Sequence, residues 1–256
     1  MPFILKKMIH SPGEVLQYRL GDLELNRLLG QEIRLRATGR IFCLACHAAI
    51  RKTYGDGLCY PCFSSLAVSD SCIIKPHTCH FAQGTCRQPE WGLKHCFRPH
   101  VVYLALTSGL KVGVTSAQGI LTRWGDQGAV GAVILARTPD RLTAGKIEVF
   151  LAGHMSDRSN WRKLITTLPE PVDLATAKIQ AAALLPAELR KFVSRDDPVH
   201  SLVYPIHRFL PKARSARLDK ESEIRGSLEG IRGQYLLFPD RALNVRRHSG
   251  FEISLD

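Results

Sequence analysis

The sequence has no long hydrophobic run. Its continuous apolar stretches, such as 132–136 and 181–185, are far shorter than the ~20 residues that a membrane-spanning helix needs. The first ten residues contain two lysines but neither an apolar stretch nor a small-residue cleavage site, which argues against a signal peptide. With 45% hydrophobic residues among 256 and no membrane-length run, we expect a soluble globular protein with no membrane partner. We expect it in the cytoplasm, because so many cysteines suited to metal binding are typical of a reducing compartment.

Several catalytic signatures are also missing. The chain has no Walker or dinucleotide-binding fingerprint and no His/Glu pattern of a metallohydrolase. No serine, cysteine or histidine triad can be assembled, because every cysteine is more simply explained as a metal ligand. Low-complexity tracts and internal repeats other than a pair of CxxC motifs are absent. Metal binding is therefore the strongest chemical signal in the sequence.

All eight cysteines lie between Cys43 and Cys96, and the first four form two CxxC motifs separated by twelve residues. Two CxxC pairs at this separation are typical of a tetrahedral zinc site, because each short loop offers two sulfurs to the same ion. Buried structural cysteines and disulfides are the alternatives, and the lack of a secretory signal weakens both. We predict a closed structural zinc site. Its ligands are Cys43, Cys46, Cys59 and Cys62.

The other four cysteines have irregular spacings and are interleaved with histidines, so their signal is less specific. We predict a second structural zinc site here, with four thiolates as the first choice of ligands. The sequence leaves open whether His77, His80 or His95 replaces one of them. The four predicted ligands are Cys72, Cys79, Cys86 and Cys96.

Basic residues exceed acidic ones, with 35 Lys and Arg against 23 Asp and Glu and a formal charge of +12. The excess is distributed along the chain and is not collected in a tail. A basic folded surface suits a polyphosphate partner, so we expect DNA or RNA. The alternative is a well-solvated basic protein without such a partner. The sequence leaves protein partners and oligomeric state open.

A mixed pattern of strands and helices follows the cysteines. Residues 100–109 and 110–115 read as a hairpin, 116–128 as a short helix, 129–137 as a buried strand and 141–154 as a second helix. The expected class is α+β. The expected regions are a β-rich leader at 1–40, a zinc-ribbon-like region at 41–98, an α/β core at 99–170, a helical linker at 171–198 and a small β-rich domain at 199–256.

The core resembles the GIY-YIG nuclease superfamily. The resemblance rests on Val102-Tyr103-Leu104, on Lys111-Val112-Gly113, and on Arg123 and Glu148 in successive helices. It is closest to the branch in which the second motif reads Lys-hydrophobic-Gly. Most of the chain also resembles a family of uncharacterised bacterial proteins of unknown function, through Cys72 to Gly128 and Gly230-Ile-Arg-Gly-Gln-Tyr-Leu.

The nuclease resemblance implies roles for individual residues. Tyr103 would orient or deprotonate an attacking water, Arg123 would stabilise the developing charge, and Glu148 would hold Mg²⁺. Lys111 stands where the superfamily usually has its second tyrosine, and no histidine follows Arg123; Gln127 lies on that side of the helix. Despite these two departures we still expect the core to bind phosphate, whereas the sequence leaves open whether it cleaves phosphodiester bonds. The nucleic-acid-binding residues implied are Lys111, Trp124, Gln127 and Asn160, and for Trp124 the alternative is burial against the hairpin.

Two further segments carry basic and aromatic residues. Ser156 to Leu168 contains Trp161 between basic residues, which suits a nucleic-acid strand or a helix whose tryptophan packs inward. The strands expected after Val199 suggest a small twisted sheet or open barrel, with Arg232, Arg246 and Arg247 candidates for its outer face.

Three functions follow from these patterns. The first is a zinc-stabilised nucleic-acid-binding protein that hydrolyses phosphodiester bonds with Mg²⁺. The second is a non-catalytic nucleic-acid-binding module, favoured by Lys111 and by the missing histidine. The third is a zinc-stabilised protein-interaction protein, which predicts no salt-dependent affinity for DNA or RNA.

Overall fold

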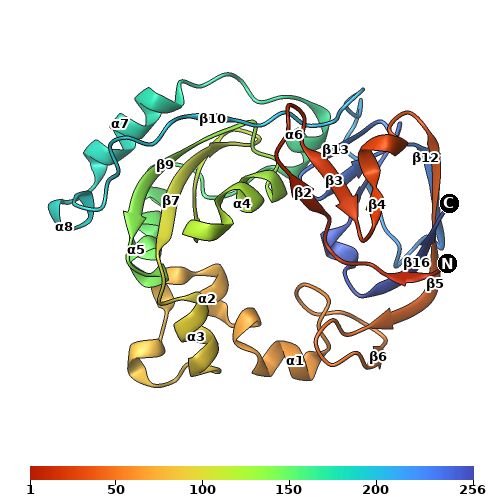
Figure 1. The fold of residues 1–256 in the computed structure, drawn as a ribbon, viewed down its shortest axis with the longest axis horizontal. Helices are drawn as coiled ribbons and strands as arrows, with labels where there is room; N and C mark the ends of the chain where they lie inside the picture. The colour runs from red at the N-terminus through yellow and green to blue at the C-terminus, as the bar shows by residue number, and fades with distance from the viewer. The chain divides into compact units, whose positions relative to one another are not determined.

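The computed structural model describes all residues from 1 to 256 and confirms the mixed α+β class, with four separate sheets (Figure 1). The chain divides into two compact units. The first unit contains residues 1–64, 161–168 and 203–256, and the second contains residues 65–160 and 169–202. Both units are therefore built from segments distant in sequence. No helix is both long enough and apolar enough to cross a membrane.

The largest sheet of the first unit joins the start of the chain to its end. Its order is β1-β16-β5-β12, all antiparallel, and β6 extends β5 at the cysteine end. Leader and C-terminal segments, assigned to different regions in the sequence analysis, thus share one sheet. Buried Ile33, Leu35, Ile224 and Ile253 alternate with polar residues that are half-buried or exposed, as expected for a sheet with one solvated face. The strands are β1 (Phe3–Ile4), β5 (Glu32–Phe42), β6 (Ala49–Ile50), β12 (Glu223–Ser227) and β16 (Phe251–Leu255).

Two smaller sheets complete the first unit, a meander near the N-terminus and a sheet of order β11-β15-β14-β13. A buried amide links them, because Met8 N donates to Gln234 Oε1 (2.9 Å) and Gln234 Nε2 donates to Met8 O (3.0 Å). The elements are β2 (Ile9–Ser11), β3 (Gln17–Leu20), β4 (Leu23–Glu24), β11 (Ser215–Ala216), β13 (Gly230–Arg232), β14 (Tyr235–Leu237), β15 (Ala242–Asn244), α6 (Trp161–Thr166), and the 3-10 helices η1 (Leu25–Leu28) and η6 (Arg246–His248). Helix α1 (Tyr60–Ser65) follows the first cysteines.

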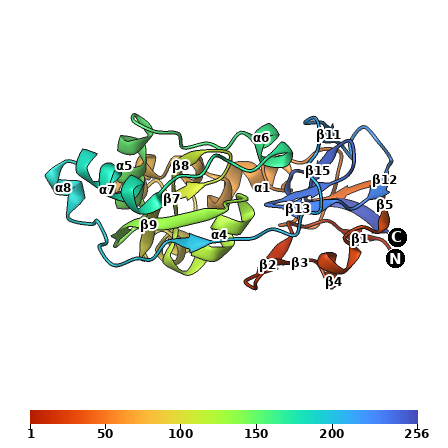
Figure 2. The ribbon, with the colours of Figure 1, turned by 90° about the horizontal axis from the view of Figure 1, so that it is seen from above.

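The second unit has one sheet of order β10-β9-β7-β8, in which the fully buried β7 is central and β8 is an edge strand. Helices α5 and α7 cover one face and α4 covers the other (Figure 2). The predicted hairpin, strand and helices are all present. The elements are β7 (His100–Leu106), β8 (Leu110–Ser116), β9 (Gly131–Thr138), β10 (His200–Ser201), α4 (Ile120–Asp126), α5 (Arg141–Ala152), α7 (Leu174–Leu184) and α8 (Ala187–Arg190).

Helix α5 is held by caps and by a close approach. Asp140 caps its N-terminus by accepting from Thr143 N (2.7 Å), and Arg141 N donates to Cys96 O (2.9 Å). A Cβ at Gly145 would lie 2.4 Å from His77 N and 2.6 Å from Pro76, so only glycine allows this packing. The helix is therefore fixed against the cysteine-rich segment. That segment contains η2 (Ala67–Ser69), α2 (Ser71–Ile74), η3 (Pro76–Thr78), η4 (Phe81–Gln83) and α3 (Pro89–His95), and η5 (Ala117–Gly119) precedes α4.

Candidate metal centres and a buried charged cluster

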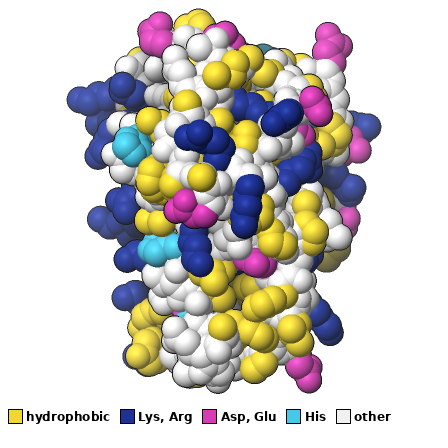
Figure 3. Space-filling view, turned by 90° about the vertical axis from the view of Figure 1, so that its left-hand side faces the viewer, with side chains coloured by type: hydrophobic (Ala, Val, Ile, Leu, Met, Phe, Trp, Pro, Cys, Tyr) yellow, Lys and Arg dark blue, Asp and Glu magenta, His cyan; other side chains and the backbone are white.

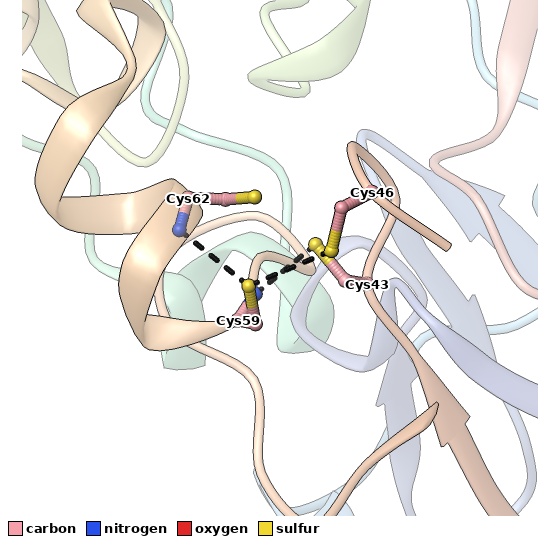
Figure 4. Close-up of side chains that lie close together, drawn as sticks. All are labelled: Cys43, Cys46, Cys59 and Cys62. Atoms are coloured by element: carbon pink, nitrogen blue, oxygen red, sulfur yellow. Dashed lines mark hydrogen bonds between the residues drawn. The ribbon is translucent and has the colours of Figure 1, made fainter. Parts of the chain in front are cut away.

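The first four cysteines converge in the first unit. Their sulfurs all lie within 4.8 Å of one another, and Figure 4 shows them pointing to a common centre from the turn after β5 and from the start of α1. Backbone N–H groups also point at the sulfurs: Cys59 N lies 3.2 Å from Cys43 Sγ, and Cys62 N lies 3.5 Å from Cys59 Sγ. The tight first loop is made possible by His47, whose φ of 60° is unusual for a residue other than glycine. The predicted four-cysteine site is therefore assembled.

The electrostatics of this cluster fit a cation. Burial raises the pKa of Cys43, but hydrogen bonds from the backbone of Cys46, Cys59 and Ala45 outweigh it and lower that pKa to about 6. Hydrogen bonding to Cys59, followed by burial, raises the pKa of Cys62. One thiol therefore ionises readily while another keeps its proton, because backbone N–H groups stabilise the Cys43 thiolate while hydrogen bonding and burial favour the Cys62 thiol. Four sulfurs at this separation are consistent with a zinc site, where the ion would neutralise that repulsion.

The second set of cysteines surrounds one small cavity in the second unit. Cys72 and Cys96 are buried, and Cys79 and Cys86 are half-buried. Burial raises the pKa of Cys72 to about 11 and also raises that of Cys96, so these thiols stay protonated without a metal. The cavity is lined by Ala67, Asp70, Cys72, Ile73, Cys79, His80, Phe81, Cys86, Trp91, Gly92 and Cys96.

Asp70 and His80 also face this cavity. Their ligand atoms and Cys72 Sγ lie within 4.8 Å of one another, which makes a second, weaker metal-binding group. Both residues have other partners, however. Asp70 lies 3.0 Å from Arg87 Nε and 3.3 Å from His80 Nε2, and His80 Nδ1 lies 2.8 Å from Thr85 Oγ1. Sequence reasoning named His80 and missed Asp70, whose role as the N-cap of α2 gives it an ordinary structural reason to be present.

Tyr103, Arg123 and Gln127 form a hydrogen-bonded group between the hairpin and α4. The Tyr103 hydroxyl lies 2.8 Å from the Gln127 side-chain amide. With the amide nitrogen facing Tyr103, the amide oxygen accepts from Nε and Nη2 of Arg123, both at 3.0 Å. Tyr103 has no exposed surface, and burial raises its pKa against the lowering effect of Arg123. The Tyr103 phenol therefore stays protonated at neutral pH, and Gln127 links it to the Arg123 guanidinium.

The packing of Tyr103 explains why the Lys-hydrophobic-Gly motif ends in glycine. Gly113 pairs with Tyr103 across the hairpin, and a Cβ at Gly113 would lie 2.5 Å from the Tyr103 hydroxyl oxygen. Only glycine lets the phenol extend across β8 toward the edge of the sheet. A shift of register between Val102 and Tyr103 in the pairing with β9 lies at the same place. Bulges often redirect a side chain near a functional site.

Arg123 is close enough to Lys111 and Glu148 for its charge to change the pKa values of both. Burial and then Arg123 lower the pKa of Lys111 to about 8, against the raising effects of Glu148 and Asp157. Burial raises the pKa of Glu148, opposed by Arg123 and Lys111. Titratable groups with pKa values shifted by burial and by specific partners are often functional. We call Tyr103, Lys111, Arg123, Gln127 and Glu148 the charged cluster.

Two residues of this neighbourhood were missed by sequence reasoning. Asp157 is exposed in the loop after α5, and its charge raises the pKa values of both Lys111 and Glu148. Arg141 is a half-buried residue whose charge acts on Glu148 and on the thiols of Cys72 and Cys96. Its guanidinium also donates to Ile73 O. A carboxylate in an irregular loop gives no periodic signal, and an arginine at a helix start is usually solvated.

The other two predicted nucleic-acid-binding residues, Trp124 and Asn160, differ in exposure. Trp124 has no exposed surface and packs edge-on against Tyr103 with ring centroids 6.0 Å apart, so it cannot stack on a base. The alternative, burial against the hairpin, is what the structure has. Asn160 is exposed at the hairpin turn, where its backbone N–H donates to Ser108 Oγ (2.7 Å). Its proposed role in a phosphate site stays a prediction.

Basic side chains are spread over the surface. Figure 3 shows the face carrying α5, α7 and α8, with Lys and Arg side chains scattered between hydrophobic ones and fewer acidic ones. On the largest sheet of the first unit, by contrast, arginines are paired with glutamates. Arg36 Nε lies 2.8 Å from Glu223, and Arg40 Nη2 lies 2.6 Å from Glu252. The net charge of the chain therefore does not mark a single basic patch.

Comparison with known proteins assigns a family but no activity. The profile of the family described as "Protein of unknown function (DUF2797)" matches residues 30–253. No curated protein and no solved structure matches the chain. The match spans both cysteine clusters and the charged cluster.

Proposed function

We propose that this chain, which belongs to the DUF2797 family of proteins of unknown function, is a zinc-stabilised nucleic-acid-binding protein that hydrolyses phosphodiester bonds at the charged cluster. The observation that carries the proposal is that the charges of Arg123 and Glu148 both act on Tyr103 and on Lys111, and that Gln127 links the buried Tyr103 to Arg123 next to the edge strand β8. Two cations and one carboxylate are the side chains that phosphoryl transfer requires. They come from three different elements, β8, α4 and α5.

Each residue has a role in this proposal. Arg123 and Lys111 contact the phosphoryl oxygens, and Glu148 holds Mg²⁺, which when bound polarises the phosphate and lowers the pKa of a coordinated water. Tyr103 is a positioning residue, because its buried hydroxyl accepts from the Gln127 amide nitrogen, and the Gln127 oxygen in turn accepts from Arg123 and fixes the guanidinium. In the reaction a P–O bond forms from water and the P–O bond to the sugar oxygen breaks. The water releases a proton to solvent, and the leaving oxygen gains one.

Zinc is proposed at both cysteine clusters. The first site uses the four sulfurs of Cys43, Cys46, Cys59 and Cys62, which already meet. For the second we propose Cys72, Cys79, Cys86 and Cys96, because all four line one cavity while Asp70 and His80 are bonded to each other and to further partners. Both sites are structural, since four thiolates leave no open position for substrate. Metal analysis of the purified protein should find close to two zinc ions per chain, and a value near zero would remove both sites.

The test is an incubation with labelled single- and double-stranded DNA and RNA, with Mg²⁺ or Mn²⁺. Wild type should cut at least one of these substrates, and Arg123→Gln and Glu148→Gln should each lower the rate by at least ~100-fold, as expected for loss of a transition-state contact. The matched controls are Arg158→Gln and Glu188→Gln, which remove exposed charges of the same unit. Equal cutting by all five proteins would mean a contaminant or another site.

A non-catalytic nucleic-acid-binding module is the second candidate. It is favoured by the complete burial of Tyr103, whose raised pKa leaves no phenolate to act as a base at neutral pH. This candidate predicts salt-dependent binding that Arg123→Gln weakens, with no cutting under any metal. The absence of both binding and cutting would instead favour a protein-interaction role.

A further inference from the structure

The first unit contains an aromatic pair that the proposed cleavage site does not use. Trp161 at the start of α6 stacks on Tyr235 of β14, with ring planes within 10° and centroids 6.4 Å apart. The guanidinium of Arg162 lies 5.0 Å from the centroid of the Trp161 ring. Both rings are half-buried, so each has an exposed part. Arginine planes and aromatic rings are the two kinds of surface on which unpaired bases stack.

The sheet of order β11-β15-β14-β13 brings more cations to this pair. Ala213 packs against the same hydrophobic cluster as Trp161 and Tyr235, and it lies between Lys212 and Arg214. Tyr235 pairs with Asn244 across the strands, and Asn244 Oδ1 accepts from Arg247 N (3.0 Å). We call the group around the aromatic pair the aromatic–basic surface. Its basic members, all exposed, are Arg162, Lys163, Lys212, Arg214 and Arg247.

Three cations of this surface, Lys212, Arg214 and Arg247, differ from the arginines of the largest sheet in the same unit. Arg36, Arg40 and Arg225 on the largest sheet each face a glutamate at salt-bridge distance. None of the salt bridges of the unit involves Lys212, Arg214 or Arg247. Positive charge left without an acidic partner next to exposed rings complements a polymer that has both phosphates and bases.

We propose that the aromatic–basic surface binds single-stranded nucleic acid, with bases stacking on the Trp161–Tyr235 pair and phosphates contacting the surrounding cations. A duplex fits less well, because its bases are already stacked on one another and present only their edges. This inference rests on the proposed nucleic-acid substrate, but it concerns a different unit and different residues. It would give the protein a second contact to the same kind of polymer.

The test uses full-length Glu148→Gln without Mg²⁺, so that no strand is cut, and follows tryptophan fluorescence on addition of oligothymidine or oligouridine. The strand should quench the fluorescence, and Trp161→Phe should lose the quenching while keeping most of the affinity. Trp124 cannot be the reporter, because it is fully buried. Quenching that persists in Trp161→Phe would contradict stacking at this position. The DNA and RNA arms distinguish the two polymers, and a duplex of the same length should bind more weakly.

A charge-matched pair of triple variants tests the cations. Lys212→Gln/Arg214→Gln/Arg247→Gln should lower the affinity roughly 10-fold or more, and the slope of log K against log salt should fall by about 2, at about 0.7 per lost phosphate contact. Arg36→Gln/Arg40→Gln/Arg225→Gln removes the same charge from paired arginines and should change the affinity less than about twofold. Equal losses in the two triple variants would overturn the proposal.

The two proposals fail separately. If the charged cluster cuts but the aromatic–basic surface does not bind, Arg123→Gln abolishes cleavage and both triple variants cut like wild type. If the aromatic–basic surface binds but the charged cluster does not cut, fluorescence quenching persists in a protein that has no nuclease activity.

Discussion

The two cysteine clusters differ in how they are connected to the rest of their units. In the first, regular CxxC spacings bring four sulfurs within 4.8 Å, and the loops pack on the turn at Ser249 and Gly250. In the second, irregular spacings line a cavity, and the segment packs directly against helix α5, which carries Glu148. The first cluster therefore packs on a loop of the β-rich first unit, while the segment of the second cluster packs on helix α5, which carries Glu148. The cysteine cluster that is easier to recognise in sequence is therefore not the one that packs against the helix of the proposed cleavage site.

The largest expected effect comes from breaking the first cluster. Cys59→Ser should remove one zinc ion per chain and unfold the first unit, because binding a structural zinc is worth about 10–16 kcal/mol in zinc-finger peptides. Cys79→Ser should also remove one zinc ion but leave the first unit folded. Zinc stoichiometry together with thermal unfolding checks both. If Cys59→Ser keeps both its metal content and its unfolding transition, the first cluster is not a structural site.

Gly145→Val should uncouple the second cluster from α5. The added side chain would meet Pro76 and the His77 backbone at under 3 Å, so the helix must move, at a cost of about 1–3 kcal/mol in unfolding free energy. Because α5 carries Glu148, cleavage should fall by more than the loss of folded protein explains. The control is Gly109→Ala at the exposed hairpin turn, where a Cβ meets nothing within 4 Å. Equal unfolding free energies of the two variants would show that the packing of Gly145 against Pro76 and His77 does not hold α5 in place.

The pH dependence of binding should identify Lys111 as the phosphate contact of the second unit. Its pKa is lowered to about 8, so the ammonium is present below pH 8 and is lost as the pH rises through that value. Affinity for an oligonucleotide, measured without Mg²⁺, should therefore fall roughly fivefold between about pH 7 and pH 9, corresponding to about 1 kcal/mol for one charge pair. Lys111→Arg should remove this fall, because arginine keeps its charge. A wild-type affinity that is flat over this range would exclude the role.

The smallest effect is expected in the loop of the first cluster. Arg246 contacts Asp56 between the two CxxC motifs, with Nε 3.0 Å from the carboxylate, but the two side chains keep 40% and 61% of their surface exposed. Arg246→Gln should lower the unfolding free energy by at most about 1 kcal/mol. Zinc content should stay the same, and the pH dependence assigned to Lys111 should be unchanged. Loss of zinc in this variant would mean that the loop, and not the sulfurs alone, determines the metal site.

Local patterns in the sequence were sufficient for part of the fold. The hairpin, α4, β9 and α5 follow from periodicity and turn residues, and the CxxC spacing predicts which sulfurs meet. Pairing between β5 and the C-terminal strands joins residues 187 to 220 positions apart, and no local pattern encodes it. Arg232 shows the same limit. Its expected place on an outer face is wrong, because the residue is fully buried and donates to Leu164 O (3.0 Å) and Thr167 O (2.9 Å) at the end of α6.

The candidate site was predicted in its residue types but not in its geometry. Tyr103, Arg123 and Glu148 belong to short motifs. These motifs do not predict that Gln127 links the Tyr103 phenol to the Arg123 guanidinium, or that the Trp124 side chain is buried. Side-chain direction in a short helix depends on which face the sheet covers, and this is a tertiary property. Asp157 in a loop and Arg141 at the start of α5 act on the charge of Glu148 through space, so only the folded chain reveals them.

The central claim is that Arg123 and Glu148 act on one phosphodiester. The most direct measurement is the Mg²⁺-dependent cleavage rate of uniformly labelled single-stranded and duplex substrates by zinc-loaded wild type, Glu148→Gln and Glu188→Gln. The account predicts cutting by wild type and Glu188→Gln, and a loss of at least ~100-fold in Glu148→Gln with binding retained. Cutting by Glu148→Gln at the wild-type rate would contradict it, as would the absence of cutting by wild type on every substrate.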